Sequence, residues 1–258
     1  MFSTSDLHVY LRQSAFLHHF SASARTEATV VHNGCMRLVL ASASPARRAT
    51  LRAAGITPIV RVSTVDEDAL LASLPGGRAL SGGSTTPADE VSALAAAKCT
   101  NVCEALARGD AELPAGEPVL VVGCDSMLEI GGQMLGKPHT PDVARERIRA
   151  MRRTTATLWT GHCAALLAPA SSTHKGTTPG RTVSASVTRS ASTQVHFGDI
   201  SDAEIDAYVA TGEPLHVAGS FTVDGLGGPF IEGVTGDYHS VVGISLPLLR
   251  SMATELGV

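Results

Sequence analysis

Between Leu38 and Arg48 the chain passes from an apolar run into two serines, a proline and paired arginines, reading Leu-Val-Leu-Ala-Ser-Ala-Ser-Pro-Ala-Arg-Arg. This order predicts a buried strand over 37–41, a loop lined by hydroxyl groups, and a helix over 46–54. Pro45 suits the first turn of that helix, because its missing N–H would have no hydrogen-bond partner there. Main-chain amides, serine hydroxyls and guanidinium groups then meet at one point, which favours binding of a phosphate chain.

Composition narrows the class of protein and its partners. The 258 residues are 44% hydrophobic and 17% charged, which suits one large globular domain or two small lobes. The net charge of −4 argues against binding to a nucleic acid polymer, because proteins that bind one are normally strongly basic. A free nucleotide stays compatible with this charge. No apolar stretch reaches the ~20 residues of a membrane span, so we expect no membrane association.

The cysteines predict a reducing, cytoplasmic setting. The five residues show no regular spacing, and their odd number leaves one over; they are Cys35, Cys99, Cys103, Cys124 and Cys163. We interpret them as reduced structural thiols. Cys99 and Cys103 lie four residues apart on a predicted helix and leave a metal pair open, although no second pair of ligands follows at a suitable spacing.

Two segments differ in composition from the rest of the chain. Residues 1–35 are rich in serine and histidine, show little periodicity and lack an apolar stretch suited to a secretory signal. We expect a disordered N-terminal extension there, or a start codon assigned too far upstream; a targeting role is the weaker alternative. Residues 169–190 are rich in Ser, Thr, Gly and Pro and predict an insertion that is either a loop or a loosely ordered hairpin. The folded domain is then expected over 36–258.

Elsewhere predicted strands and helices alternate along the chain, which indicates an α/β fold. Apolar patterns predict further strands over 59–63, 119–122, 155–167 and 193–197, and a hairpin turning at Gly131-Gly132. Periodicity and capping residues predict helices from Thr86 or Asp89 to Arg108, from Pro141 onwards, from Asp202 to Gly212 and over 245–256. Residues 73–87 predict a mobile loop, and 219–243 an irregular segment.

Lys98 and Asp125 stand out against their apolar surroundings. Lys98 falls on the same helical stripe as Val91 and Val102, so it either reaches the surface or points into a site that holds negative charge. Asp125 closely follows the apolar stretch Val119–Val122. We therefore expect Asp125 at the carboxyl end of a buried strand, where open α/β sheets bind ligands. A turn-forming aspartate is the simpler alternative.

Together with the serine-rich loop, four side chains supply what nucleotide hydrolysis needs, namely Glu67, Lys98, Asp125 and Lys137. Lysine and arginine bind phosphate oxygens, while carboxylates hold Mg²⁺ or Mn²⁺ or take a proton from the attacking water. Each residue also has an ordinary explanation, since the serines could cap a helix and Glu67 and Lys137 could be solvated. The sequence has no Gly-x-x-x-x-Gly-Lys-Ser/Thr loop, which excludes a P-loop enzyme.

Several motifs in this order resemble the Maf family of nucleoside triphosphate pyrophosphatases, over nearly all of 36–258. They are Leu-Ala-Ser-Ala-Ser-Pro-Ala-Arg-Arg (40–48), Val-Asp-Glu (65–67), Ala-Ala-Ala-Lys (95–98), Gly-Cys-Asp-Ser (123–126), Leu-Gly-Lys-Pro (135–138), Tyr-Val-Ala-Thr-Gly-Glu-Pro (208–214), Ala-Gly-Ser-Phe (218–221) and Gly-Asp-Tyr-His-Ser-Val-Val-Gly (236–243). The resemblance implies a mixed twisted sheet with flanking helices and two lobes around a central cleft. It also implies a house-cleaning enzyme that uses Mg²⁺ or Mn²⁺ to cleave ribo- or deoxyribonucleoside triphosphates into the monophosphate and diphosphate.

The same resemblance assigns roles by position. Asp125 would be the proton acceptor, and Glu67 and Asp125 would place the metal ion. The residues that would bind substrate are Ser42, Ser44, Arg47, Arg48, Lys98 and Lys137.

Three positions depart from the family members that prefer dTTP and UTP, which carry arginine, threonine and glutamine where this chain has Ala46, Ser126 and Asp224. The alanine removes a fixed cation, for which Arg48 could compensate. Asp224 replaces a neutral amide with a carboxylate that only accepts hydrogen bonds, so contacts to the base should differ; a surface turn is the alternative reading. Residues 238–241 look less like the branch that acts on methylated guanosine nucleotides. The preferred base therefore stays open.

Two rival functions would use the same residues. A nucleotide-binding regulator linked to cell division would bind nucleoside triphosphates without turnover. A nucleotidyltransferase would need a second, acceptor substrate. The sequence also leaves open whether the chain forms a homodimer.

Overall fold

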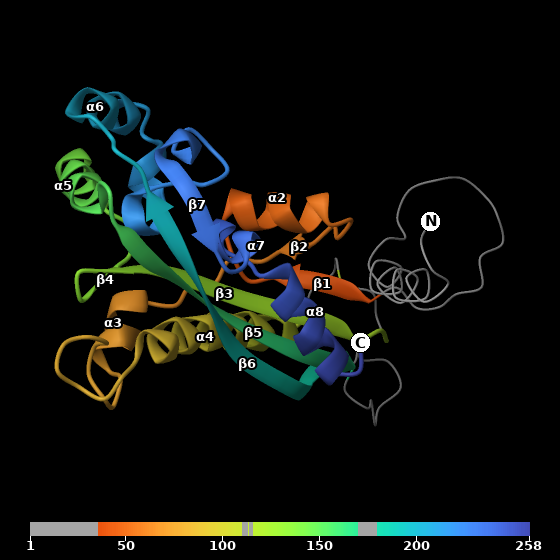
Figure 1. The fold of residues 1–258 in the computed structure, drawn as a ribbon. Coiled ribbons are helices and arrows are strands. Elements are labelled where there is room, and N and C mark those ends of the chain that lie inside the picture. The colour runs from red at the N-terminus through yellow and green to blue at the C-terminus, as the bar shows by residue number, and fades with distance from the viewer. Residues whose placement is uncertain (1–35, 110–112, 114–115, 170–179) are drawn as a thin grey trace, which may run out of the picture.

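A curved, mixed β-sheet forms the framework of the protein, in a computed structural model that describes residues 36–109, 113, 116–169 and 180–258 (Figure 1). Its strand order is β2-β1-β3-β5-β6-β7, with β4 paired to β3. The strands are β1 (Arg37–Leu40), β2 (Ile59–Val60), β3 (Val119–Ile130), β4 (Gln133–Leu135), β5 (Thr155–Pro169), β6 (Arg181–Phe197) and β7 (Ile231–Thr235). β1 runs parallel to β2 and β3, and the other pairings are antiparallel. The predicted α/β fold with a mixed sheet is confirmed.

Helices cover both faces of this sheet. They are α2 (Pro45–Ala53), α3 (Glu67–Ala72), α4 (Pro87–Ala107), α5 (Pro141–Met151), α6 (Asp202–Ala210), α7 (Tyr238–Val242) and α8 (Leu246–Glu255), with short 3₁₀ turns η1 (Glu213–His216), η2 (Ala218–Ser220) and η3 (Gly228–Phe230). One core cluster joins α2 and α8 to the side chains of Leu38, Leu40 and Val122. A second joins α4 to Val39 and Val121, which point to the opposite face because side chains alternate along a strand.

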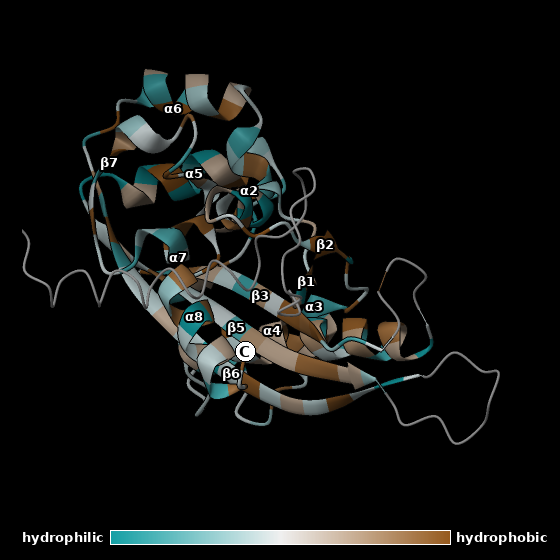
Figure 2. Cartoon of the chain, turned by 90° about the vertical axis from the view of Figure 1, so that its right-hand side faces the viewer, coloured by the Kyte–Doolittle hydropathy of each residue, from teal (hydrophilic) through white to brown (hydrophobic). Residues whose placement is uncertain are grey.

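A third core cluster lies toward the far end of the long strands. There α5 and α6 pack on β3, β5 and β6 through residues such as Ile148, Ile205 and Phe197. Figure 1 shows these two helices set apart from α4 and α8, an arrangement that agrees with the predicted two lobes. In Figure 2 the hydrophobic colour runs along β3 and β5, which form the buried middle of the sheet.

Capping residues set the starts of α4 and α6 where the sequence predicted them. Thr86 and Asp89 form a reciprocal capping box at the start of α4, and Ser201 and Glu204 form another at the start of α6. Both boxes satisfy amide groups that a helix leaves without partners in its first turn. None of the helices in the described part of the chain combines the length and the apolar composition that crossing a membrane requires.

The most consequential correction concerns β3. The sequence placed Asp125 beyond a strand that stops at Val122, but β3 continues to Ile130 and holds Asp125 in mid-strand. The reason is β5, which pairs with β3 without interruption from Val119 to Glu129. Main-chain hydrogen bonds to β5 therefore keep the Gly-Cys-Asp-Ser segment (123–126) in a strand.

Several further predictions were wrong in detail. Of the loop or loosely ordered hairpin predicted over 169–190, the residues from Arg181 onwards form a strand that pairs antiparallel with β5, so for them the loop alternative is wrong. Residues 219–243 contain β7 and α7, and the strand predicted over 59–63 is reduced to Ile59–Val60. Residues 1–35 and 170–179 lie outside the described residues, so the expected N-terminal extension stays a prediction.

The loop predicted over 73–87 has anchors in the folded structure. Glu90, a fully buried residue of α4, accepts hydrogen bonds from Arg78 Nε at 2.6 Å and from the Ala79 amide at 2.8 Å. A buried carboxylate needs such partners to offset its lost hydration. Glu90 therefore ties this loop to the first turns of α4.

Candidate active site

One edge of β3 lacks a paired strand next to Asp125. β1 pairs with β3 only as far as Leu40 opposite Val122, and β4 pairs with the same edge only from Leu128 onwards. Along residues 123–127 this edge of β3 therefore has no paired strand, while β5 pairs their other edge. Asp125 therefore does not lie at the end of its own strand, as was expected, but close to the end of its parallel neighbour β1.

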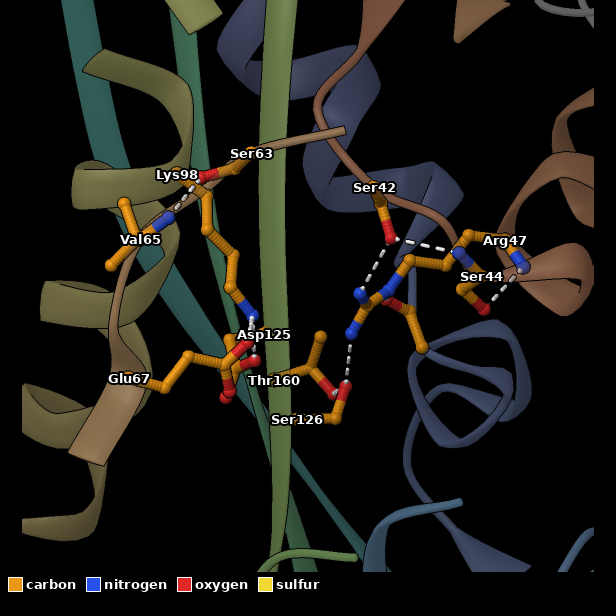
Figure 3. Close-up of polar contacts among 11 residues, drawn as sticks. Ser42, Ser44, Arg47, Ser63, Val65, Glu67, Lys98, Asp125, Ser126 and Thr160 are labelled. Atoms are coloured by element: carbon orange, nitrogen blue, oxygen red, sulfur yellow. Dashed lines mark hydrogen bonds and ion pairs between the residues drawn. The ribbon is translucent and has the colours of Figure 1, made fainter. Parts of the chain in front are cut away.

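On one face of β3, three charged side chains form what we call the acid–lysine cluster: Glu67, Lys98 and Asp125 (Figure 3). Lys98 Nζ lies 2.5 Å from Asp125 Oδ1 and 2.7 Å from Glu67 Oε1. Glu67 is the first residue of α3, and Lys98 lies in the middle of α4. The lysine on the apolar stripe thus points toward negative charge and not to the surface, and its side chain is only 12% exposed.

Two glycines let α4 approach the sheet closely enough for this contact. A Cβ atom at Gly123 would lie 2.4 Å from the Ala95 carbonyl oxygen, and one at Gly161 would lie 2.0 Å from the Val91 carbonyl oxygen. Both carbonyls belong to α4, so any larger residue would push the helix away. The close approach places Lys98 within reach of Asp125.

The environment of Asp125 favours a base. The residue is only 7% exposed, and burial raises the pKa of its carboxyl group, an effect that the positive charges of Lys98 and Arg47 partly offset. A carboxylate with a raised pKa binds a proton more tightly than an exposed aspartate does.

On the opposite face of β3 lies what we call the arginine–serine cluster: Ser42, Arg47, Ser126 and Thr160 (Figure 3). Arg47 donates from Nη1 to Ser42 Oγ at 3.0 Å and from Nη2 to Ser126 Oγ at 3.1 Å. Its Nε donates to the Gly243 carbonyl oxygen at 2.7 Å. Three of the five guanidinium N–H groups are thus engaged, which leaves two for a ligand.

The serines of the loop before α2 have different positions. Ser44 is the N-cap of α2, and its Oγ accepts from the Arg47 amide at 3.3 Å. The helix-capping explanation therefore holds for Ser44. Ser42 Oγ accepts from the Ser44 amide at 3.2 Å as well as from Arg47, so its own proton stays available to a ligand.

Four residues singled out in the sequence do not join these clusters. Lys137 and Arg48 are exposed, and within the described residues no hydrogen bond or ion pair links either one to Asp125. Ala46 lies in the first turn of α2. Asp224 is exposed in a bend, as the surface-turn alternative expected.

Sequence analysis missed two buried residues of β5 that support the site. Thr160 contacts Ser126, and His162 Nδ1 donates to the Thr160 carbonyl oxygen at 3.1 Å. His162 Nε2 accepts from the Ser245 amide at 2.8 Å, and burial lowers the pKa of this histidine to about 4, so it stays neutral. Polar residues within a buried strand were the available signal for both.

The acid–lysine cluster also fits a hard divalent cation. Glu67 and Asp125 present carboxylate oxygens to one point, now shared by the ammonium of Lys98. Within the described residues no group of three or more His, Cys, Asp or Glu side chains is arranged to hold a metal ion. Two carboxylates are nevertheless enough where phosphate oxygens and water complete the coordination of Mg²⁺ or Mn²⁺.

Comparisons with known proteins give a family match and several similar relatives. Residues 37–256 match the family model described as Maf-like protein. A protein of Saccharopolyspora erythraea named nucleoside triphosphate pyrophosphatase is 50% identical over 224 residues, covering 86% of this chain and 94% of its own. Proteins of the same name from Nocardia farcinica and Streptomyces coelicolor are 49% and 48% identical, covering 86% of this chain and 93% and 91% of their own.

Proposed function

Because this chain belongs to the Maf-like protein family, we propose that it hydrolyses nucleoside triphosphates between the α- and β-phosphates, releasing the monophosphate and diphosphate. The observation that carries the proposal is the buried Asp125, held 2.5 Å from Lys98 beside an open strand edge. A base and fixed cations beside one unpaired strand edge are what attack by water on a phosphoanhydride requires.

In this proposal Asp125 accepts the proton of the attacking water. Its raised pKa makes it a stronger base than an exposed aspartate, while the positive charges of Lys98 and Arg47 favour its ionised form. Lys98 transfers part of its attraction from the two carboxylates to phosphate oxygens when substrate arrives. This stabilises the negative charge that develops on the leaving diphosphate.

The arginine–serine cluster binds and orients the triphosphate. Arg47 offers its two remaining N–H groups, and Ser42 offers its hydroxyl proton. Lys137 and Arg48 are exposed, and we propose that they contact phosphate only once the substrate is bound. Ala46, Ser126 and Asp224 are proposed to influence which base is accepted.

Glu67 and Asp125 would hold Mg²⁺ or Mn²⁺ together with phosphate oxygens. The cation would neutralise phosphate charge and polarise the bond that breaks. Glu67 is suited to this role because its side chain is 48% exposed and can change partners without a large rearrangement.

The experiment incubates the full chain with each canonical nucleoside triphosphate and Mg²⁺ or Mn²⁺ and measures diphosphate and orthophosphate separately. We expect diphosphate and monophosphate in equal amounts. Orthophosphate as the first product would contradict the proposed bond. Tight binding without product would favour a regulator, and activity that needs an acceptor alcohol or phosphate would favour a nucleotidyltransferase.

We further propose that the protein works in the cytoplasm. The four described cysteines are buried free thiols, which suits a reducing compartment. A homodimer remains a prediction, which size-exclusion chromatography with light scattering would test.

A further inference from the structure

We propose that Thr160 is a positioning residue that holds Arg47 through the hydroxyl of Ser126, an inference that rests on the proposed function of Arg47 in binding phosphate. Thr160 Oγ1 lies 3.0 Å from Ser126 Oγ and donates to the Ser240 carbonyl oxygen at 2.9 Å. Ser126 Oγ in turn accepts from Arg47 Nη2 at 3.1 Å. A side chain on β5 thus connects with a guanidinium group on α2.

The direction of every proton in this chain of contacts is fixed by its two ends. The guanidinium of Arg47 can only donate, and the carbonyl of Ser240 can only accept. The Thr160 hydroxyl donates its single proton to the Ser240 carbonyl oxygen, so the Thr160 oxygen accepts a hydrogen bond from Ser126. The Ser126 hydroxyl therefore donates its proton to Thr160 and accepts from Arg47 with a lone pair.

The contacts close into a ring. The Gly243 amide donates to the Ser240 carbonyl oxygen at 3.1 Å, and the Gly243 carbonyl accepts from Arg47 Nε at 2.7 Å. Arg47 is therefore held from two sides, by Ser126 on β3 and by the residue that ends α7. Figure 3 shows Thr160 and Ser126 beneath the guanidinium, on the side of β3 away from Lys98.

Burial makes the Thr160 hydroxyl costly to replace. Thr160 and Ser240 have no exposed surface, so water cannot substitute for a lost partner. Thr160→Val keeps the shape but leaves the Ser126 proton without its acceptor. Ser126 then rotates toward another acceptor, and Nη2 of Arg47 loses the lone pair that fixes it.

The test compares Thr160→Val with Thr160→Ser, which keeps the hydroxyl, and with Thr193→Val as a matched control. Thr193 is 1% exposed and donates to the Asp237 carbonyl oxygen at 3.1 Å, in the same segment as Ser240 but with no contact to Ser126. Two readouts are used: kcat and KM for the preferred nucleoside triphosphate, and the Kd of inorganic tripolyphosphate measured by calorimetry. The second does not depend on turnover.

We expect Thr160→Val to raise both KM and the tripolyphosphate Kd about tenfold, with a smaller change in kcat. Thr160→Ser should restore most of the affinity, and Thr193→Val should lower thermal stability without this loss of affinity. Wild-type affinity in a folded Thr160→Val protein would overturn the inference. If the wild type bound tripolyphosphate but released no diphosphate, the proposed function would fail while the calorimetry still decided the inference.

A double-mutant cycle with Ser126→Ala sharpens the test. Both substitutions break the same chain of contacts. The tripolyphosphate Kd of the double variant should therefore be about equal to the higher of the two single-variant Kd values. Additive losses would show that Thr160 and Ser126 act independently, which would also overturn the inference.

Discussion

The two faces of β3 differ in how they hold their charged groups. In the acid–lysine cluster the partners are ions, and Lys98 bridges two carboxylates over 2.5 Å and 2.7 Å. In the arginine–serine cluster the partners of Arg47 are neutral, namely two hydroxyls and a main-chain carbonyl. Ion pairs depend on protonation and on competing ions, whereas contacts to neutral groups mainly fix geometry.

The comparison indicates that the two faces of β3 have different roles. The ionic face can respond to a substrate, because its charges exchange partners and its aspartate titrates. The neutral face is suited to hold a guanidinium in one orientation whether or not a ligand is present. Substitution of Asp125 or Lys98 on the first face should therefore change turnover and its pH dependence, and substitutions on the second face should change KM.

The largest effect is expected from Asp125→Asn. Removing the proton acceptor should lower kcat by about 10³-fold or more, because the amide cannot take a proton from water. The measurement is diphosphate release at saturating substrate. Tripolyphosphate affinity serves as the control and should survive, and a variant that turned over at the wild-type rate would remove Asp125 from the mechanism.

Lys98→Met should rank next, with a loss of about 10²-fold in kcat/KM. It also tests the pH response of this face. The positive charge of Lys98 lowers the pKa of Asp125, so its removal raises that pKa further. Because only the ionised base is active, activity falls as the pH drops through this pKa. The acidic limb of the kcat/KM profile should consequently move to higher pH, and a limb that stayed in place would mean that another group titrates.

Arg47→Lys should distinguish the effect of the arginine–serine cluster on KM from the effect of the acid–lysine cluster on the pH profile. A lysine keeps the charge but cannot contact Ser42, Ser126 and Gly243 at once. We expect KM to rise about tenfold with little change in the position of the pH profile. A large shift of the acidic limb would contradict the division between the faces.

Glu67→Gln should have the smallest effect. Its side chain is 48% exposed, so solvent weakens its ion pair with Lys98. We expect kcat at saturating Mg²⁺ to change by about twofold or less and the Mg²⁺ concentration for half-maximal activity to rise several-fold, since one carboxylate ligand is lost. An unchanged Mg²⁺ requirement would argue that Glu67 does not help to place the cation.

Residues that break a local pattern were the most predictable part of the site. A lysine on an apolar helical stripe and an aspartate next to an apolar stretch are each costly to bury, so the sequence alone pointed to both. Helix starts such as Thr86 and Ser201 were predictable for a similar reason, because their capping partners are local in sequence.

The features that the sequence did not predict depend on residues far away along the chain. The strand character of Arg181–Ser190 comes from pairing with β5 and not from its own polar residues. Two of the three partners of the Arg47 guanidinium are 79 and 196 residues away along the chain, at Ser126 and Gly243. A strand that forms because a neighbouring strand pairs with it leaves no local sequence pattern. A hydrogen bond between residues so far apart in the chain leaves none either.

The bridging position of Lys98 means that the acid–lysine cluster carries a counter-ion of its own. The fold can therefore assemble without a dissolved cation, since the ammonium keeps the two acids from repelling each other. Substrate binding is then an ion exchange, in which Lys98 leaves the two carboxylates and contacts phosphate. Nucleotide and divalent cation should each promote the binding of the other, because each one releases the charges that its companion needs.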